Sequence, residues 1–212
     1  MNKGSQSAAG SQGTQMWANA ERYLILTGGP GAGKSALIET LRQSGYATSV
    51  EAGRGIIQHQ MDIGGRALPW IDPALFAEMM LDWEMRSYDI ARTKVGAVFF
   101  DRGVPDVAGY LRLMGLPIPE YVRKAVEVFR YNRRVFIAPP WKEIFCQDRE
   151  RKQDFDEAVR TYDALAVTYS EFGYELVEIP RVPIPERVQF ILQNIKAEPL
   201  SSPLLNPRAR PK

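Results

Sequence analysis

The chain has 212 residues, of which 45% are hydrophobic, enough to bury one sizeable core but not a second full domain. Its 27 basic and 25 acidic side chains leave a formal net charge of +2, so overall charge does not support a nucleic-acid or membrane-surface role. No apolar run reaches the roughly 18 residues of a membrane span, and the N-terminus lacks the apolar core of a signal peptide, so we expect a cytoplasmic protein. The single cysteine, Cys146, excludes an internal disulfide, and the single histidine, His59, excludes a His/Cys zinc cluster.

The two ends differ in composition from the middle of the chain. Residues 1–20 are rich in Gly, Ser, Gln and Ala and show almost no apolar periodicity, which predicts a disordered leader. Residues 197–212 contain regularly spaced prolines, which predict a disordered tail. We therefore expect one folded domain over residues 21–196.

The first ordered stretch predicts a strand, a loop and a helix. Residues 23–27 form a short apolar run, and residues 36–43 carry apolar side chains at helical spacing. Between them, Gly28–Ser35 reads GGPGAGKS and fits the phosphate-binding pattern G-x-x-x-x-G-K-[ST] at every fixed position. Glycines permit turns in which successive N–H groups point at phosphate oxygens. Lys34 supplies a charge for the β- and γ-phosphates, and the Ser35 hydroxyl a ligand for Mg²⁺. The residues predicted to contact ATP are Gly28, Gly29, Pro30, Gly31, Ala32, Gly33, Lys34, Ser35 and Leu37.

The next elements lead to a long helix. Gly45 is placed to end the first helix, and residues 46–50 predict a second strand that delivers Glu51. The dipeptide Asp72-Pro73 offers an N-cap and a first-turn proline for a helix that runs to about residue 94. One face of this helix is expected to enter the core. Its apolar members are Phe76, Met80, Trp83 and Ile90.

The second half of the chain continues the alternation of strands and helices. Residues 97–100 are a continuous apolar run, typical of a central parallel strand, and this run ends at Asp101-Arg102. Further strands are predicted over residues 134–138 and 174–179, with a last helix over residues 184–195. Five strands alternating with helices predict a three-layer α/β/α fold around a five-stranded parallel sheet. Ligands of such sheets bind beyond the carboxyl ends of the strands.

The ends of the first three strands bring together groups suited to phosphoryl transfer. Asp101 can anchor, together with Ser35, the Mg²⁺ that a bound triphosphate needs. The proton of the acceptor needs a base, and both Glu51 and Asp101 qualify by residue type. Arg102 can hold an acceptor phosphate or stabilise charge on the transferred group. Each of these charges alone fits a solvated loop, but their placement on successive strand ends favours catalysis.

The pairing of GGPGAGKS with FFDRGVPDVAGY resembles the P-loop nucleoside and nucleotide kinases, such as thymidylate and deoxynucleoside kinases, in which an acidic residue and an arginine follow the central strand. Over residues 22–196 the chain is more similar still to small bacterial AAA-like predicted ATPases related to the ribosylnicotinamide kinase domain. This resemblance implies that Glu51 is the acidic residue after the second strand. Gly103 stands where better-known kinases have an aromatic residue or serine, and no base-recognition motif is evident, so the acceptor stays open.

The same resemblance implies a lid near residues 146–155, where the sequence DRERK precedes a helix. Arg149 and Arg151 would close over the phosphates, stabilise charge on the γ-phosphate and exclude water. For Lys152 a solvated helix start is an equal alternative. Arg181, which follows the last strand, would border the adenine, as such loops do in related kinases.

Three functions compete for this set of residues. The leading hypothesis is a kinase, a monomer or homodimer, that moves the γ-phosphate of ATP to a small nucleoside- or nucleotide-like acceptor. The alternative is an ATPase or nucleotide-dependent switch that acts on a macromolecule, and a third is a scaffold that binds nucleotide for stability. A GTPase is disfavoured because the guanine-reading sequence N-K-x-D is absent. The chain also has no room for the extra helical domain of an AAA-type motor.

Overall fold

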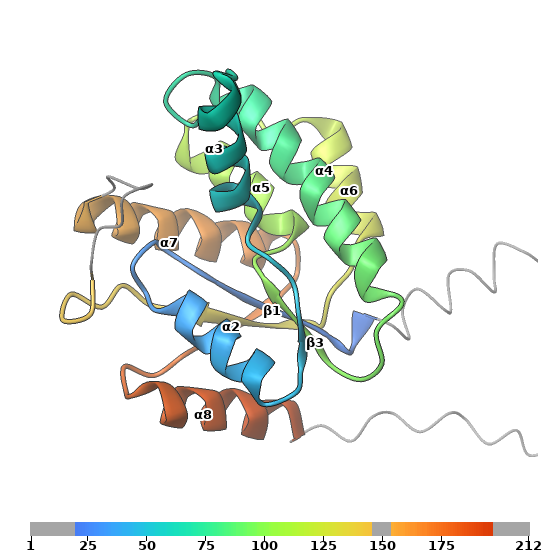
Figure 1. The fold of residues 1–212 in the computed structure, drawn as a ribbon, viewed down its shortest axis with the longest axis vertical. Helices are drawn as coiled ribbons and strands as arrows, with labels where there is room; N and C mark the ends of the chain where they lie inside the picture. Colours follow the sequence, from blue (N-terminus) through green and yellow to red (C-terminus); the bar gives the residue numbers. More distant parts are fainter. Residues whose placement is uncertain (1–19, 146–153, 197–212) are drawn as a thin grey trace, which may run out of the picture.

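The computed structural model describes residues 20–145 and 154–196 (Figure 1). Outside the described residues lie residues 1–19 of the predicted leader, the predicted tail, Cys146 and the predicted lid residues Arg149, Arg151 and Lys152. Their roles therefore stay predictions.

One sheet of five parallel strands forms the centre of the described part of the chain (Figure 1). The strands are β1 (Tyr23–Gly28), β2 (Ala47–Thr48), β3 (Val98–Asp101), β4 (Arg134–Ala138) and β5 (Glu175–Glu178). Their order is β2-β3-β1-β4-β5, so β1 is central, with β3 on one side and β4 on the other. The chain crosses from one side of β1 to the other between β3 and β4, and ligands bind at such a switch point. The predicted fold class is confirmed.

Helices cover both faces of the sheet (Figure 1). They are α2 (Lys34–Gln43), α3 (Ala52–Ile63), α4 (Pro73–Ala91), α5 (Val104–Leu113), α6 (Glu120–Val128), α7 (Phe155–Glu171) and α8 (Ile184–Lys196). Helices α2 and α8 pack on one face, and α4 to α7 on the other, with α3 against α4. None of these described helices is long and apolar enough to cross a membrane.

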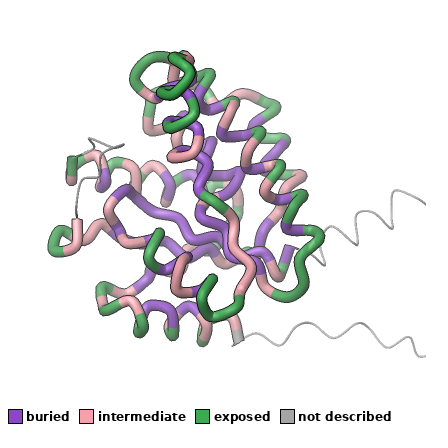
Figure 2. Tube along the Cα trace, in the orientation of Figure 1, coloured by how far each residue is buried: buried purple, intermediate pink, exposed green. Residues whose placement is uncertain are grey.

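The central strand shows how the sequence divides the core into two layers. Tyr23 and Ile25 pack with the cluster under α4 to α7, while Leu24 and Leu26 pack with the cluster under α2 and α8. All four side chains are buried, as is the whole strand (Figure 2). Successive strand residues point to opposite faces, so a continuous apolar run is what a strand covered on both faces requires.

Two details of the expected elements are wrong. The second strand pairs in register only over Ala47–Thr48 rather than over residues 46–50. Ser49 still donates its N–H to the carbonyl oxygen of Phe99, but there the N–H of Asp101 donates to the Ser49 side chain, and the regular ladder ends. Ile90, predicted on the core face of the long helix, is 51% exposed. The buried stripe of α4 instead passes through Glu84 and Tyr88, because it advances in steps of four residues and turns away from Ile90.

Candidate active site

The loop between β1 and α2 has the backbone that its glycines predict. A Cβ on Gly28 would lie 2.4 Å from the carbonyl oxygen of Ala138, so the neighbouring strand excludes any larger residue. Gly31 and Gly33 have φ values of 69° and 80°, in the left-handed region that favours glycine. The result is a tight turn that leads directly into the first turn of α2.

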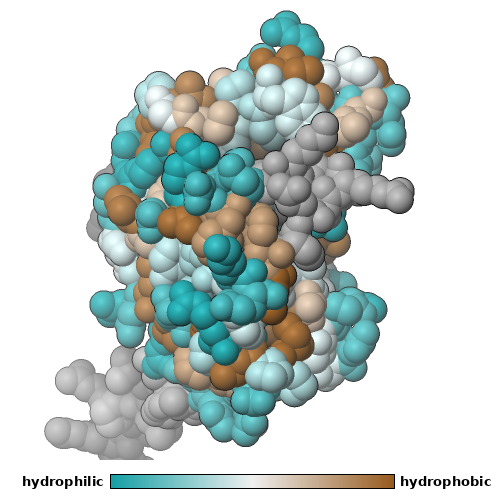
Figure 3. Space-filling view, turned by 90° about the vertical axis from the view of Figure 1, so that its left-hand side faces the viewer, coloured by the Kyte–Doolittle hydropathy of each residue, from teal (hydrophilic) through white to brown (hydrophobic). Residues whose placement is uncertain are grey.

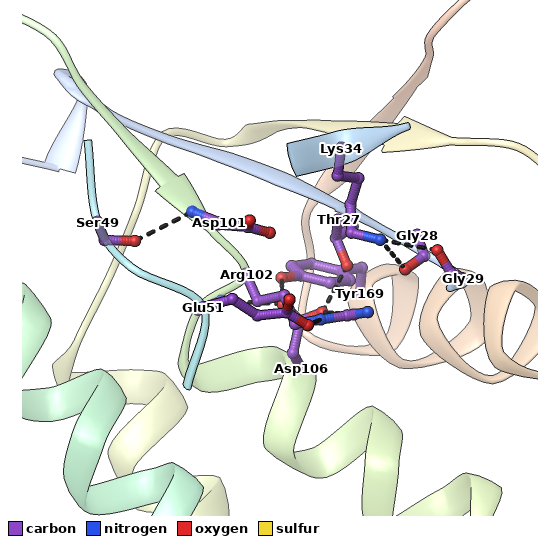
Figure 4. A network of polar contacts seen from close by, with 11 residues as sticks. Thr27, Gly28, Gly29, Lys34, Ser49, Glu51, Asp101, Arg102, Asp106 and Tyr169 are labelled. Carbon is purple, nitrogen blue, oxygen red and sulfur yellow. Dashed lines mark hydrogen bonds and ion pairs between the residues drawn. The ribbon is translucent and has the colours of Figure 1, made fainter. Parts of the chain in front are cut away.

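Lys34 lies across this loop (Figure 4). Its side chain is buried, and Nζ donates to the carbonyl oxygens of Gly28 at 2.9 Å and Gly29 at 2.7 Å. These two hydrogen bonds hold the ammonium group against the loop. Carbonyl oxygens satisfy it more weakly than phosphate oxygens do, because hydrogen bonds between charged groups are the stronger ones.

Other predicted loop residues occupy different environments. Ser35 is exposed at the start of α2, where its hydroxyl is accessible to a ligand. Pro30 lines a cavity described below. Leu37 has no exposed surface and packs in the core between α2 and the sheet. Its side chain is part of the core and offers no surface to a nucleotide, although the residue was predicted to contact one.

The end of β3 carries a strained backbone. Asp101 is 5% exposed, and its N–H donates to Oγ of Ser49 at 3.0 Å. Arg102 follows with φ of 73°, the one non-glycine residue with a positive φ in the described part of the chain. Such backbone strain in a non-glycine residue persists only where the surroundings hold it, and it clusters at functional sites. Asp101 and Arg102 therefore leave the strand end in different directions (Figure 4).

Arg102 is clamped between two carboxylates (Figure 4). Nε lies 3.3 Å from Oε1 of Glu51, and Nη1 lies 3.0 Å from Oδ1 of Asp106. Burial disfavours the charged guanidinium, but Asp106, Glu51 and Asp101 outweigh burial and raise the pKa of Arg102 above its usual value. The structure thus brings the predicted Glu51 and Arg102 together in one buried ion-pair network.

Asp106 is the centre of this network, and sequence reasoning gave it no role. Besides Arg102, its carboxylate accepts hydrogen bonds from the Thr27 hydroxyl at 2.5 Å, the Tyr169 hydroxyl at 2.5 Å and the Gly103 N–H at 3.0 Å. These donors come from β1, α7 and the start of α5, so Asp106 fixes Arg102 against three elements. One sequence signal was available, because an acidic side chain three positions after the N-cap residue can accept from the N-cap N–H, as Asp106 does from Gly103.

Sequence reasoning also gave no role to a second acidic residue, Glu84 on α4, which stands between apolar residues in the sequence. It is 2% exposed, and Oε2 has no hydrogen-bond partner among the described residues. Burial, followed by the charges of Asp106 and Asp101, raises the pKa of Glu84 well above its usual value. The signal for its burial was its spacing, four residues after Met80 on the face that enters the core.

A cavity of about 760 Å³ adjoins the network and the phosphate loop. Its walls are mainly apolar and aromatic side chains from α3, α4, α5, α7 and the segment between α3 and α4, among them Ile57, Trp70, Phe76, Met80, Tyr110 and Leu165. Its charged lining consists of Glu51, Arg102, Asp106 and Glu157. Figure 3 views the molecule from the side of the strand ends, and apolar side chains (brown) gather in the middle of this face. Volume and composition are those of a small-molecule site.

The opposite side of the phosphate loop, after β4 and β5, carries the predicted Arg181. This side chain is exposed, and Nε donates to the carbonyl oxygen of Pro140 at 3.2 Å. Arg181 therefore links the loop after β5 to the loop after β4. A contact between Arg181 and an adenine stays a prediction.

Comparisons with known proteins agree with the fold and the motif. A family model described as an AAA domain matches residues 23–187. No curated protein sequence matches the chain.

Solved structures extend the comparison at low sequence identity. Deoxyadenosine kinase from M. mycoides with bound dCMP and dCDP superposes with a TM-score of 0.58 at 12% identity, covering 83% of this chain and 100% of that one. NadR protein in complex with NR gives a TM-score of 0.64 at 15% identity, covering 85% of this chain and 52% of that one. NadR protein in complex with NAD and AMP-PNP gives 0.62 at 15% identity, covering 92% and 59%. At these identities the likeness shows the fold. The chain belongs to the AAA-domain family whose model it matches, and it has the fold of the P-loop kinases.

Proposed function

We propose that the protein is an ATP-dependent phosphotransferase that moves the γ-phosphate of ATP to a hydroxyl group of a small, nucleoside-like acceptor. One observation carries this proposal: the Glu51–Arg102–Asp106 network lies on the wall of a cavity that also touches the phosphate loop at Pro30. A donor held at the loop and an acceptor held in the cavity would meet beside Glu51. The structural neighbours act on, or are solved with, nucleosides and nucleotides, which supports the substrate class.

The chemistry that follows is an in-line transfer with Glu51 as the base. The acceptor hydroxyl gives its proton to the Glu51 carboxylate while its oxygen bonds to the γ-phosphorus. The bond from that phosphorus to the bridging oxygen breaks, and ADP leaves. Arg102 holds Glu51 in place at 3.3 Å, and Lys34 neutralises charge on the β- and γ-phosphates. Glu51 is the better of the two predicted bases because it lines the cavity, whereas Asp101 is not among the lining residues.

Magnesium would be held by Ser35 and Asp101. Both offer oxygen ligands, which Mg²⁺ prefers, and Ser35 stands where the phosphate loop enters α2. When bound, the ion supplies charge neutralisation on the phosphates and fixes their orientation.

Asp101→Asn tests the assignment of Asp101 to the metal. We expect the Mg²⁺ concentration that gives half-maximal activity to rise by about 10- to 100-fold, because a carboxylate near the ion loses its charge. The measurement is the rate of ADP formation over a range of Mg²⁺ concentrations. Asp82→Asn, at an exposed position on α4, is the control that should behave as wild type. An unchanged Mg²⁺ dependence in Asp101→Asn would remove this residue from the metal site.

The charge of the cavity favours an acceptor without a phosphate. Arg102 is the one cation among the described residues that line it, and two carboxylates already engage Arg102. Glu51, Asp106 and Glu157 make the charged lining acidic overall. An acceptor phosphate would meet these carboxylates and would have to displace one of them from Arg102.

We therefore predict that nucleosides are better acceptors than their 5′-monophosphates. The assay compares ADP formation from ATP with a panel of nucleosides and with the matching monophosphates at equal concentrations. Phosphorylated products are identified by mass spectrometry, which separates transfer from hydrolysis. Faster turnover of monophosphates would contradict the proposed acceptor class. Equal phosphate release with and without every acceptor would instead support the alternative of an ATPase or nucleotide-dependent switch.

A further inference from the structure

Arg187, to which sequence reasoning gave no role, is buried against the phosphate loop. It lies in the first turns of α8, which packs beside α2 (Figure 1). The residue is 1% exposed, and Nη2 donates to the carbonyl oxygen of Ala32 at 3.1 Å. Nη1 would lie 2.9 Å from a Cβ built on Gly33, so the guanidinium rests directly on the loop.

The guanidinium of Arg187 is poorly satisfied where it lies. Nε and Nη1 have no hydrogen-bond partner, and no carboxylate forms a salt bridge with Arg187, within residues 20–145 and 154–196. The ring of Trp141 lies 5.9 Å away and gives only a cation–π contact. Burial lowers the pKa of Arg187, which reflects the cost of keeping this charge away from water. Buried cations in folded proteins are normally paired, so one that is not paired requires an explanation.

The position of Arg187 indicates which ligand would satisfy it. The acceptor cavity opens on the side of β3, lined by Glu51, Arg102 and Asp106. Arg187 touches the loop from the other side, where α8 and the segment after β4 meet, so it cannot serve the acceptor. The group that must lie at this loop is the phosphate chain of the donor, and a guanidinium with two available N–H groups matches phosphate oxygens.

We propose that Arg187 is a second cation of the donor site, which binds the phosphate chain of the nucleotide together with Lys34. This inference rests on the proposed function. In the free protein, Trp141 and the Ala32 carbonyl cover the guanidinium, and phosphate binding shifts these contacts. Arg187 thus contributes affinity for the donor and positions it, while the acceptor network stays independent.

The experiment is calorimetric titration of wild type and Arg187→Met with two ligands, ATP and inorganic tripolyphosphate, each with Mg²⁺. We expect both affinities to fall by about 10- to 100-fold, the loss of one or two hydrogen bonds between charged groups. The melting temperature of free Arg187→Met should equal or exceed that of wild type, because the substitution removes an unpaired buried charge. Arg130→Met is the matched control. Arg130 also stacks on an aromatic ring, that of Tyr174 at 4.8 Å, and donates to a backbone carbonyl, but it lies where strands β4 and β5 begin, at the end of the sheet away from the phosphate loop.

Each other outcome overturns the proposal in a recognisable way. Unchanged affinities would show that Arg187 binds no phosphate, and a loss confined to ATP would assign it to the nucleoside half. A lower melting temperature of the free variant would identify a structural brace for the loop. If Arg187→Met does not fold, Arg187→Lys decides, because it keeps the charge with a shorter reach and should still weaken both ligands. If wild type binds neither ligand, the proposed function itself fails, whereas tight binding by both wild type and variant refutes only the role of Arg187.

Discussion

Lys34→Ala should lower the rate of phosphoryl transfer by about 10²- to 10³-fold, the usual effect of removing one preorganised electrostatic donor. In the free protein the ammonium group donates to the carbonyl oxygens of Gly28 and Gly29. The substitution is expected to act mainly on the bound phosphates, which carry the charge that Lys34 is placed to neutralise. Single-turnover rates with saturating ATP give the effect on the chemical step, and melting temperatures show that the fold is intact.

The control for Lys34→Ala is Lys124→Ala. Lys124 is 68% exposed on α6 and pairs with Glu127, so its removal changes net charge by the same amount without touching the loop. A Lys34→Ala enzyme with at least a tenth of the wild-type rate would mean that this lysine does not stabilise the transferred phosphate.

Glu51→Gln is the second substitution with a large expected effect. Losing a general base typically costs about 10²- to 10⁴-fold in rate. Glutamine preserves the shape of the side chain and can still accept a hydrogen bond from Arg102, so ATP affinity should stay near the wild-type value. Steady-state rates with acceptor and calorimetric titration with ATP separate the two quantities. Glu120→Gln, at an exposed position on α6, is the matched control.

Variants of Arg102 test the same assignment, in which the Glu51–Arg102–Asp106 network serves the acceptor and the phosphate loop binds ATP. The choice of variant matters. Arg102→Ala would leave Glu51 and Asp106 as buried carboxylates without their cation, which typically costs about 3–5 kcal/mol of stability. Arg102→Lys retains the charge and is the cleaner test. We expect it to impair transfer to the acceptor and to leave ATP affinity nearly intact. If either the Glu51 or the Arg102 variant lost ATP binding while remaining folded, the assignment of this network to the acceptor would be wrong.

Features of the chain that depend on local sequence were predictable. The phosphate loop is a contiguous motif whose glycines dictate its backbone, and the apolar runs of β1, β3 and β4 reflect strands covered on both faces. The N-cap of α4 follows the same logic, because Asp72 accepts from the N–H of Leu75 at 3.1 Å. From the order of strand ends, the sequence also predicted that Glu51 and Arg102 would meet.

The missed residues depend on contacts between distant segments. Asp106 gains its role because Thr27 and Tyr169, far away in the chain, converge on one carboxylate. Glu84 and Arg187 lie within amphipathic helices, in which a charged residue is normally assigned to the face exposed to solvent. Helical periodicity also explains the wrong prediction for Ile90. It gives the direction of the apolar face but not the angle at which the helix crosses the sheet, which decides which residues of that face are buried.

The most direct test of this account is calorimetric titration of the full chain with ATP, ADP and GTP in the presence of Mg²⁺. The proposal predicts saturable binding of ATP and ADP at one site per chain, and weaker binding of GTP because no guanine-reading sequence is present. Binding should depend on the phosphate loop and be weakened in Lys34→Ala. If the wild-type protein, with its melting transition intact, binds none of the three nucleotides, the central claim that Gly28–Ser35 forms a nucleotide site is contradicted.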